Sequence, residues 1–312
     1  MPHVPKPSAG SPRRSARDVP SPDPIGSGED DALAQIAQSF AANPDADVGT
    51  SDAVEPGSGG SSLDSASLLN QDETSNTEPR PTFSMAEMTD AELIAALRMI
   101  EVEDQERLPR VEVTEANGQH AALMRIDHPI KLRIRGPLGD YALAVNVQTV
   151  AKVFGEVGHG VAEGMMSGSV RVRGNAGDGA GTAQVGGTLG IYGSAGNRVG
   201  ASMRGGGIFV RGNVGDDVGL GAIRGTIVIG GDAGNNVGDP HSDVAVYIRG
   251  KVSGLADGVV ETSLRKKQEV QLGLLLISAG IRGDAKDFRR IVPAAKLEAE
   301  NASRGEIAPN WR

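Results

Sequence analysis

Apolar positions recur with a nineteen-residue period from Leu132 to Leu264, without an insertion. Seven units share this period, and their first residues are Leu132, Ala151, Val170, Leu189, Ile208, Ile227 and Val246. The first position of each unit is apolar and the third is β-branched, whereas the second and fourth vary in polarity. Such alternation predicts a short strand whose first and third side chains point inward. We therefore expect each unit to form one coil of a solenoid.

Glycine punctuates every unit. The fifth position is glycine throughout, at Gly136, Gly155, Gly174, Gly193, Gly212, Gly231 and Gly250. We expect a positive φ at these corners, since glycine adopts it without strain. Small apolar residues at positions seven and eleven would then face a narrow core. The sequence predicts an all-β fold, a single-stranded parallel β-helix whose seven coils, ~4.8 Å apart, stack into a rod of about 34 Å.

The segment before the repeat, residues 85–131, is expected to cap the solenoid. Thr89 and Glu92 have the spacing of a capping box, which predicts a helix beginning at this point. Short strands are expected around residues 111–113 and 123–126, because β-branched and other apolar residues cluster there.

The repeat domain, residues 132–264, is followed by residues 265–312, which we expect to form a capping helix and a tail. Helical periodicity spans residues 267–281. The predicted packing face consists of Val270, Leu274, Ile277 and Ile281, and the apolar arc is widened by Leu272, Leu275 and Leu276. Solenoids need such caps because their end coils would otherwise expose apolar side chains.

The chain begins with an acidic tail, residues 1–84, which holds 13 acidic and 5 basic residues. It is rich in Pro, Ser, Gly and Asp, a composition that predicts disorder. The rest of the chain carries 27 acidic and 26 basic side chains, so the body of the protein is nearly neutral. This balance lacks the basic excess of a nucleic-acid-binding protein.

Position four of the repeat should point outward. Cations alternate there with aromatic residues or glycine, in the order Arg135, Phe154, Arg173, Tyr192, Arg211, Gly230 and Arg249. Rings between the cations would separate like charges and offer cation–π contacts of ~0.5–1 kcal/mol each. The column is either a ladder that only stabilises the rod or a docking surface for a partner.

Position two changes character along the rod. It is basic in the first three units, at Arg133, Lys152 and Arg171, and apolar in the last three, at Phe209, Val228 and Tyr247. Three adjacent outward apolar residues predict a covered patch. The C-terminal segment or another subunit would cover it, and we include these three residues in the candidate docking surface.

Catalytic and metal-binding patterns are not found in the sequence. The chain has no cysteine, and its five histidines lack metal-ligand spacing. Asp178, Asp216, Asp217 and Asp232 suggest either a calcium ladder or tight turns, and we favour turns. No apolar stretch is long enough to cross a bilayer and no signal peptide is evident, so we expect a cytoplasmic protein with no membrane or nucleic-acid partner.

The segments GNAGDGAG, GNVGDDVG and GDAGNNVG resemble the GXGXG domain. That domain closes the large subunit of glutamate synthase and also occurs in a formylmethanofuran dehydrogenase subunit. The resemblance covers residues 110–285 and implies a right-handed β-helix of about seven turns.

This chain looks like the stand-alone version of that domain, found in split glutamate synthases and N-methylglutamate synthase-like complexes. The resemblance implies two partners, a class II glutamine amidotransferase subunit and an FMN-binding glutamate synthase-domain subunit with an iron–sulfur cluster. Cysteines perform ammonia release and hold the cluster in that family, so a chain without cysteine is expected to be a structural subunit that binds no cofactor. Two alternatives stay open: a component of a formylmethanofuran dehydrogenase-type complex, and a β-helix enzyme acting alone.

Overall fold

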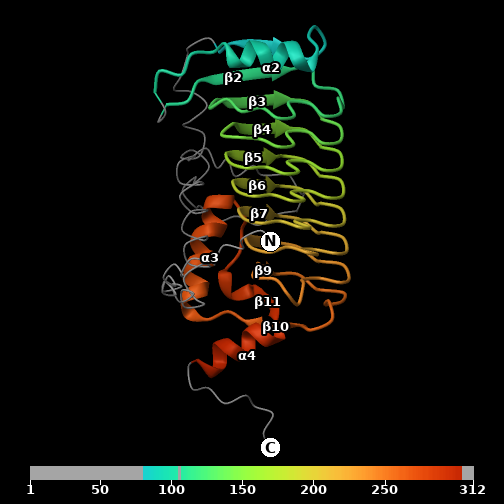
Figure 1. The fold of residues 1–312 in the computed structure, drawn as a ribbon, viewed down its shortest axis with the longest axis vertical. Coiled ribbons are helices and arrows are strands. Elements are labelled where there is room, and N and C mark those ends of the chain that lie inside the picture. Colours follow the sequence, from blue (N-terminus) through green and yellow to red (C-terminus); the bar gives the residue numbers. More distant parts are fainter. Residues whose placement is uncertain (1–79, 105–106, 304–312) are drawn as a thin grey trace, which may run out of the picture.

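The computed structural model describes residues 80–104 and 107–303 and shows a rod of stacked coils (Figure 1). Most of the predicted tail lies outside these residues. Its predicted boundary is wrong at one point, because β1 (Thr82–Ser84) already belongs to the sheet and pairs with β2 (Arg110–Thr114).

Parallel pairing of one strand per coil builds the rod. After β2 the strands are β3 (Lys131–Arg135), β4 (Val150–Phe154), β5 (Ser169–Val172), β6 (Thr188–Ile191), β7 (Gly207–Val210), β8 (Thr226–Ile229) and β9 (Ala245–Ile248). The register pairs Leu132 with Ala151, and the same nineteen-residue offset continues to Ile227 and Val246. The predicted parallel β-helix with its nineteen-residue coil is therefore confirmed.

The inner faces of the strands form one continuous apolar core. The first and third residues of each coil are buried, for example Leu132 at 1% and Ile134 at 0% exposure. Position seven adds isolated parallel bridges, such as Leu138 with Val157 and Val157 with Ala176. Burying the same apolar columns between successive coils makes each coil depend on its neighbours for stability.

The glycine column at position five has a different cause from the one predicted. Only Gly136 of the seven has a positive φ, at 112°, so the expected left-handed corner is wrong for the other six. A Cβ atom on Gly155 would lie 2.4 Å from the carbonyl oxygen of Gly136. The amide of Gly174 donates to the Gly155 carbonyl at 3.1 Å, and this pattern repeats up to Gly250. Glycine is needed because successive backbones stack too closely for a side chain.

Left-handed backbone occurs later in the coil, at several turn positions that include position ten of the first six coils. The φ angles at position ten are 59° at Tyr141, 67° at Gly160, 73° at Gly179, 61° at Arg198, 63° at Asp217 and 56° at Asn236. Four of these six residues are not glycine, so the turn tolerates side chains that point away from the stack.

Two columns of short polar side chains connect the coils. At position nine the Asp178 Oδ1 atom accepts from the amide of Asn197 at 2.7 Å, and Asn197 accepts from Asp216 at 2.8 Å. At position six the Asn213 Oδ1 atom accepts from the amide of Asp232 at 2.9 Å. These acceptors satisfy backbone donors that the turns would leave open.

The N-terminal end of the rod is covered by α2 (Asp90–Arg98), which lies across it in Figure 1. The predicted capping box is confirmed, and Leu93 and Leu97 are buried against the core. The strand predicted at residues 123–126 is wrong. Leu123 has a φ of 56°, and its amide donates to Asp90 at 2.6 Å, so the segment forms the turn of an additional coil that begins with β2.

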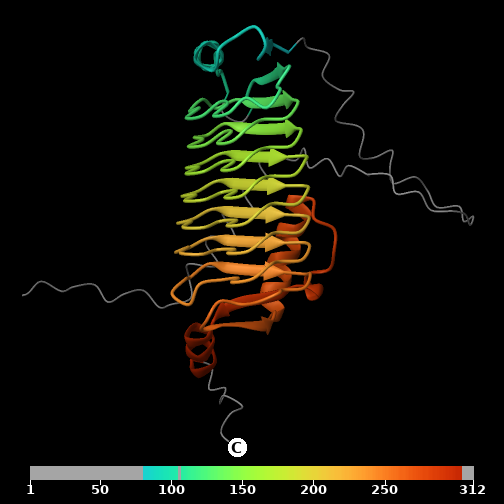
Figure 2. The same cartoon turned by 90° about the vertical axis from the view of Figure 1, so that its right-hand side faces the viewer.

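The C-terminal end departs from the parallel pattern. It comprises β10 (Val259–Ser263), α3 (Lys266–Ala279), a 3₁₀ turn (Ala285–Asp287), β11 (Arg289–Pro293) and α4 (Ala294–Ala302). Strand β11 runs antiparallel between β9 and β10, which ends the parallel stack. The helix predicted as the terminal cap, α3, instead runs along the flank of the last coils (Figures 1 and 2).

The predicted packing face of α3 is also wrong for three of its four residues. Val270, Leu274 and Ile277 are 66%, 57% and 75% exposed, and the fourth, Ile281, is buried beyond the end of the helix. The buried helical residues are Leu272, Leu275, Leu276 and Ala279. The helix packs against the outer face of the sheet. Leu272, Leu275 and Leu276, which lay beside the packing face predicted from the sequence, make this contact.

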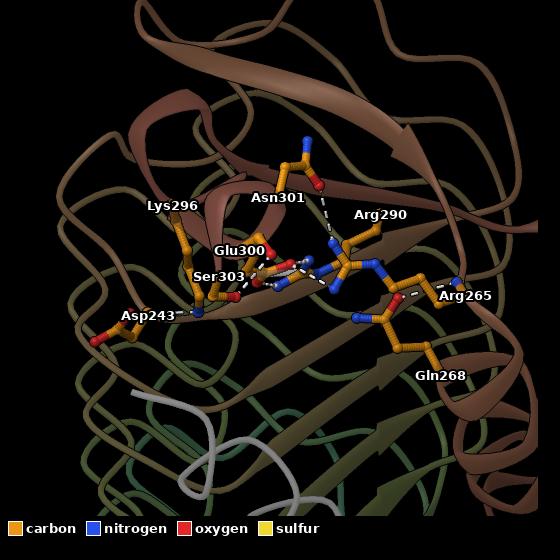
Figure 3. A network of polar contacts seen from close by, with 8 residues as sticks. All are labelled: Asp243, Arg265, Gln268, Arg290, Lys296, Glu300, Asn301 and Ser303. Carbon is orange, nitrogen blue, oxygen red and sulfur yellow. Dashed lines mark hydrogen bonds and ion pairs between the residues drawn. The ribbon is translucent and has the colours of Figure 1, made fainter. Parts of the chain in front are cut away.

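A polar network fastens α4 to β11 and to the start of α3 (Figure 3). Glu300 accepts from Arg290 at 3.0 and 2.9 Å and pairs with Arg265 at 3.1 Å. Burial acts to raise the pKa of Glu300, but the hydrogen bond and charge of Arg290, with Arg265 and Lys296, outweigh it and hold the pKa below its ordinary value.

Candidate docking surface

Position four presents a ladder of cations and rings over the first coils. The guanidinium carbons of Arg135 and Arg173 lie 4.6 and 5.7 Å from the centre of the Phe154 ring, and Arg173 lies 5.4 Å from Tyr192. Arg135 is exposed and also donates from Nε to Glu112 at 2.6 Å. That bond is the main reason why the pKa of Glu112 lies below its ordinary value. The predicted interleaving of charge and ring is present in the structure.

Over the last coils, C-terminal residues of the same chain cover the position-four column. Arg249 donates from Nε to the Gly230 carbonyl at 2.7 Å, bonds the Arg282 carbonyl and lies 5.9 Å from the Phe288 ring. A Cβ atom on Gly280, at the end of α3, would be 3.3 Å from Tyr192. Arg211 lies between these coils and is half-buried. Within the position-four ladder, Arg135 is exposed, whereas Phe154 and Arg173 are half-buried like Arg211.

Phe209, Val228 and Tyr247 are not on the surface, contrary to their inclusion in the docking surface. They are 1%, 0% and 1% exposed and pack against the buried side of α3. The sequence analysis offered two possible covers for these apolar residues, the C-terminal segment or another subunit, and the structure shows the C-terminal segment. The apolar side of α3 buries the position-two column because removing both apolar surfaces from water is favourable.

Position two at the other end of the rod forms a basic hollow. It has a volume of about 60 Å³ and six cationic residues in its lining: Arg80, Arg110, Lys131, Arg133, Lys152 and Arg171. The other lining residues are Leu132, Val150 and Ala151, so none of the lining side chains is acidic. Arg171 is only 3% exposed. The basic hollow opens on the same strand face that α3 covers further along.

The sequence analysis missed three exposed apolar residues at position sixteen of the repeat. Met166 and Val185 occupy this position in successive coils and Ile223 two coils further along, and they are 52%, 49% and 57% exposed. Position sixteen follows the buried column of Met165 and Met203 at position fifteen. The three apolar residues lie on the turn side of the rod and are interrupted by the exposed Arg204.

Within residues 80–104 and 107–303, no three His, Asp or Glu side chains lie close enough to hold a metal ion. A wider hollow, about 420 Å³, includes Asp239, whose Oδ2 and Oδ1 atoms accept from the amides of Gly221 and His241 at 2.9 and 2.8 Å. That carboxylate serves the local turn. No helix among the described residues is long and apolar enough to span a membrane.

Comparison with known proteins gives one partial likeness. The chain is 41% identical over 59 residues to Protein GlxC of Rhizobium meliloti (strain 1021). The match covers 19% of this chain and 26% of that protein, so the chain spans about a quarter of the length of its relative. No protein-family model matches the sequence.

Proposed function

We propose that this chain is a non-catalytic structural subunit of a glutamate synthase-type oxidoreductase complex. It would hold a class II glutamine amidotransferase subunit and an FMN-binding glutamate synthase-domain subunit, which also carries the iron–sulfur cluster, in fixed relative positions. The partial likeness to Protein GlxC gives weak support to a glutamate synthase-related role.

The observation that carries the proposal is the use of the polar turn residues. Asp178, Asn197, Asp216 and Asn213 each accept a hydrogen bond from the next coil, so their acceptor atoms maintain the stack. A rod held in this way is stiff along its length and suits the positioning of two other proteins, since a misplacement of about 1 Å in a catalytic arrangement can cost ~100-fold in rate.

Co-purification tests the proposal. The full-length tagged chain is recovered from the cells that produce it, and the purified material is examined for amidotransferase and synthase partners, for flavin absorbance and for glutamine-dependent formation of glutamate or N-methylglutamate. We expect activity only from the assembled complex. Turnover by the pure chain would contradict the proposal, and recovery of molybdenum- or tungsten-containing partners would favour the formylmethanofuran dehydrogenase alternative.

The docking surface can be tested in the same preparation. Replacing Arg135 and Phe154 with Ala removes the exposed cation of the position-four ladder and the ring beneath it. We expect recovery of one partner to fall at least about tenfold, which corresponds to the loss of ~1.4 kcal/mol of binding free energy. Arg198→Ala is the matched control, because its exposed guanidinium lies in a turn at position ten.

A further inference from the structure

The turn side of the rod holds most of the exposed apolar residues in the described part of the chain. Ten large apolar side chains are exposed there, and six of them lie at positions ten to sixteen of coils one to five, counted from the coil that begins at Leu132. These six are Tyr141, Val145, Met166, Val185, Leu220 and Ile223. Apolar side chains gathered on one side of a protein mark a surface that contacts another molecule.

Backbone hydrogen bonds fix the spacing of these side chains. At position sixteen the amide of Val185 donates to the Met165 carbonyl at 2.8 Å, and the amide of Arg204 donates to the Gln184 carbonyl at 2.7 Å. Successive coils are therefore one strand spacing apart on this side as well, ~4.8 Å. Position fourteen of coils two to five carries only small residues, which are Gly164, Ala183, Ser202 and Gly221. A second surface can approach such a side closely.

Two opposite charges interrupt the apolar residues at equal distances from coil three. Glu163 belongs to coil two and is half-buried, and Arg204 belongs to coil four and is exposed. Neither side chain forms an ion pair with a described residue, whereas the neighbouring Arg198 pairs with Asp217 at 3.8 Å. The order along the rod is therefore apolar, acidic, apolar, basic and apolar. Such an order is complementary to itself when it is reversed.

We propose that two copies of this chain associate through the turn side, with their rods antiparallel and a two-fold axis at coil three. In such an isologous contact, coil two of one copy faces coil four of the other, so Arg204 meets Glu163 of the second copy. Val185 lies on the axis and meets its own counterpart. A parallel arrangement would instead bring Arg204 to Arg204 and Glu163 to Glu163, and like charges at these contacts disfavour association.

Coil one faces coil five in the same antiparallel arrangement. Val145 of one copy then meets Ile223 of the other, which buries both apolar side chains. The exposed Tyr141 ring of coil one comes near the exposed Arg224 of coil five, a pairing that offers a cation–π contact. Each of the five coils thus finds matching chemistry on the same surface, and for this reason we assign the face to a second copy of the chain.

Sedimentation velocity of the isolated full chain measures the association. The contact spans only five coils, so we expect a dissociation constant on the order of 10 µM. Arg204→Glu should weaken association at least about tenfold, and so should Glu163→Arg, because each change brings like charges together at two symmetry-related places. The double variant Glu163→Arg with Arg204→Glu should return to within about threefold of the natural chain. Lys251→Glu is the matched control, since Lys251 is exposed in coil seven, outside the contact.

A single-cysteine variant tests the position of the axis. The natural chain has no cysteine, so the thiol of Val185→Cys can form a disulfide only with a second copy. A disulfide needs Cα atoms about 4–7 Å apart, which two residues beside a two-fold axis satisfy. Under mild oxidation we expect at least about fivefold more disulfide-linked dimer from Val185→Cys than from Ile277→Cys, whose site on α3 is 75% exposed and lies outside the contact.

Three outcomes would overturn the proposal. The first is a chain that stays monomeric up to about 100 µM, tenfold above the expected dissociation constant. The second is a dimer that the single charge reversals leave unchanged or that the double variant does not restore. The third is an equal yield of disulfide-linked dimer from the two cysteine variants. All these measurements use the chain alone, so their result is independent of the partner subunits in the proposed function.

Discussion

Arg290 donates two hydrogen bonds to Glu300, from Nη1 to Oε2 at 3.0 Å and from Nη2 to Oε1 at 2.9 Å. The two residues belong to β11 and α4, and Arg290 is only 1% exposed. The pair therefore ties the last helix to the strand that ends the parallel stack. A buried cation of this kind is stabilising only while its anion is present.

Glu300→Gln should destabilise the C-terminal end by about 3 kcal/mol, because it removes the carboxylate that pairs with the buried Arg290 and with Arg265. Hydrogen exchange of α4 and β11 measures the effect. Glu298→Gln is the matched control, since Glu298 is exposed on the same helix. Equal protection of α4 and β11 from hydrogen exchange in both variants would show that the Arg290–Glu300 pair contributes little to the stability of the C-terminal end.

The same pair makes stability depend on pH. The folded pKa of Glu300 lies below the ordinary value of 4.5, so the unfolded chain binds more protons in acid. The contribution is complete above about pH 5.5 and is lost as the pH falls through the folded pKa. Urea titrations of the natural chain and Glu300→Gln should differ by a constant amount from pH 7 to 5.5 and converge in stronger acid. A difference that grows as the pH falls would contradict this assignment.

Gly155→Ala should destabilise the rod by about 3 kcal/mol, since its Cβ atom would lie 2.4 Å from the Gly136 carbonyl oxygen. Gly190→Ala is the comparison, because its Cβ atom would meet only Arg171 Cγ at 3.8 Å. There we expect no loss, or a gain of ~0.5 kcal/mol from the less flexible unfolded chain. Thermal unfolding measures the stability of the two variants. Similar unfolding midpoints would show that close approach of successive backbones is not the reason for glycine at position five.

Asp178→Asn should preserve stability and Asp178→Ala should lose about 1 kcal/mol. The amide oxygen of asparagine can still accept from the Asn197 amide, as the Asp178 Oδ1 atom does at 2.7 Å, whereas alanine cannot. Urea unfolding with and without added calcium gives the measurement. A calcium-dependent loss in Asp178→Asn would revive the calcium interpretation.

Leu275→Ala should release α3 from the sheet at a cost of about 3 kcal/mol, because Leu275 is 1% exposed. Ile277→Ala, at a position that is 75% exposed, should change stability by less than about 0.5 kcal/mol. Limited proteolysis of the two variants compares how readily α3 detaches. The reverse order would restore the packing face predicted from helical periodicity.

The coils could be predicted from the sequence because each constraint is repeated. The β-branched third position and the glycine at position five recur in every unit, so chance variation at one coil does not hide the pattern. The reason for the glycine could not be predicted, since a close approach and a left-handed turn both exclude a side chain. Only the register that places Gly155 over Gly136 distinguishes them.

The C-terminal elements had no repetition to support a prediction. In α3, Val270 and Leu275 are both apolar, and a helix with apolar residues on several sides does not reveal which side meets the sheet. The return of β11 between β9 and β10 depends on contacts far apart in sequence. The basic hollow was visible as three basic residues of position two, but Arg80 and Arg110 join it only through the pairing of β2 with β3.

The nineteen-residue offset is constant from β3 to β9, so the length of this part of the rod can change only by whole coils. A whole unit inserted between residues 188 and 189 would bring its own glycines and its own Asx acceptors at positions six and nine. The two ends of the protein would then move apart by one strand spacing, ~4.8 Å, without a change in either end. Two proteins bound at opposite ends of the rod would therefore be separated by distances that change only in steps of one strand spacing. Duplication or deletion of one unit, in evolution or by design, would change that separation by one step.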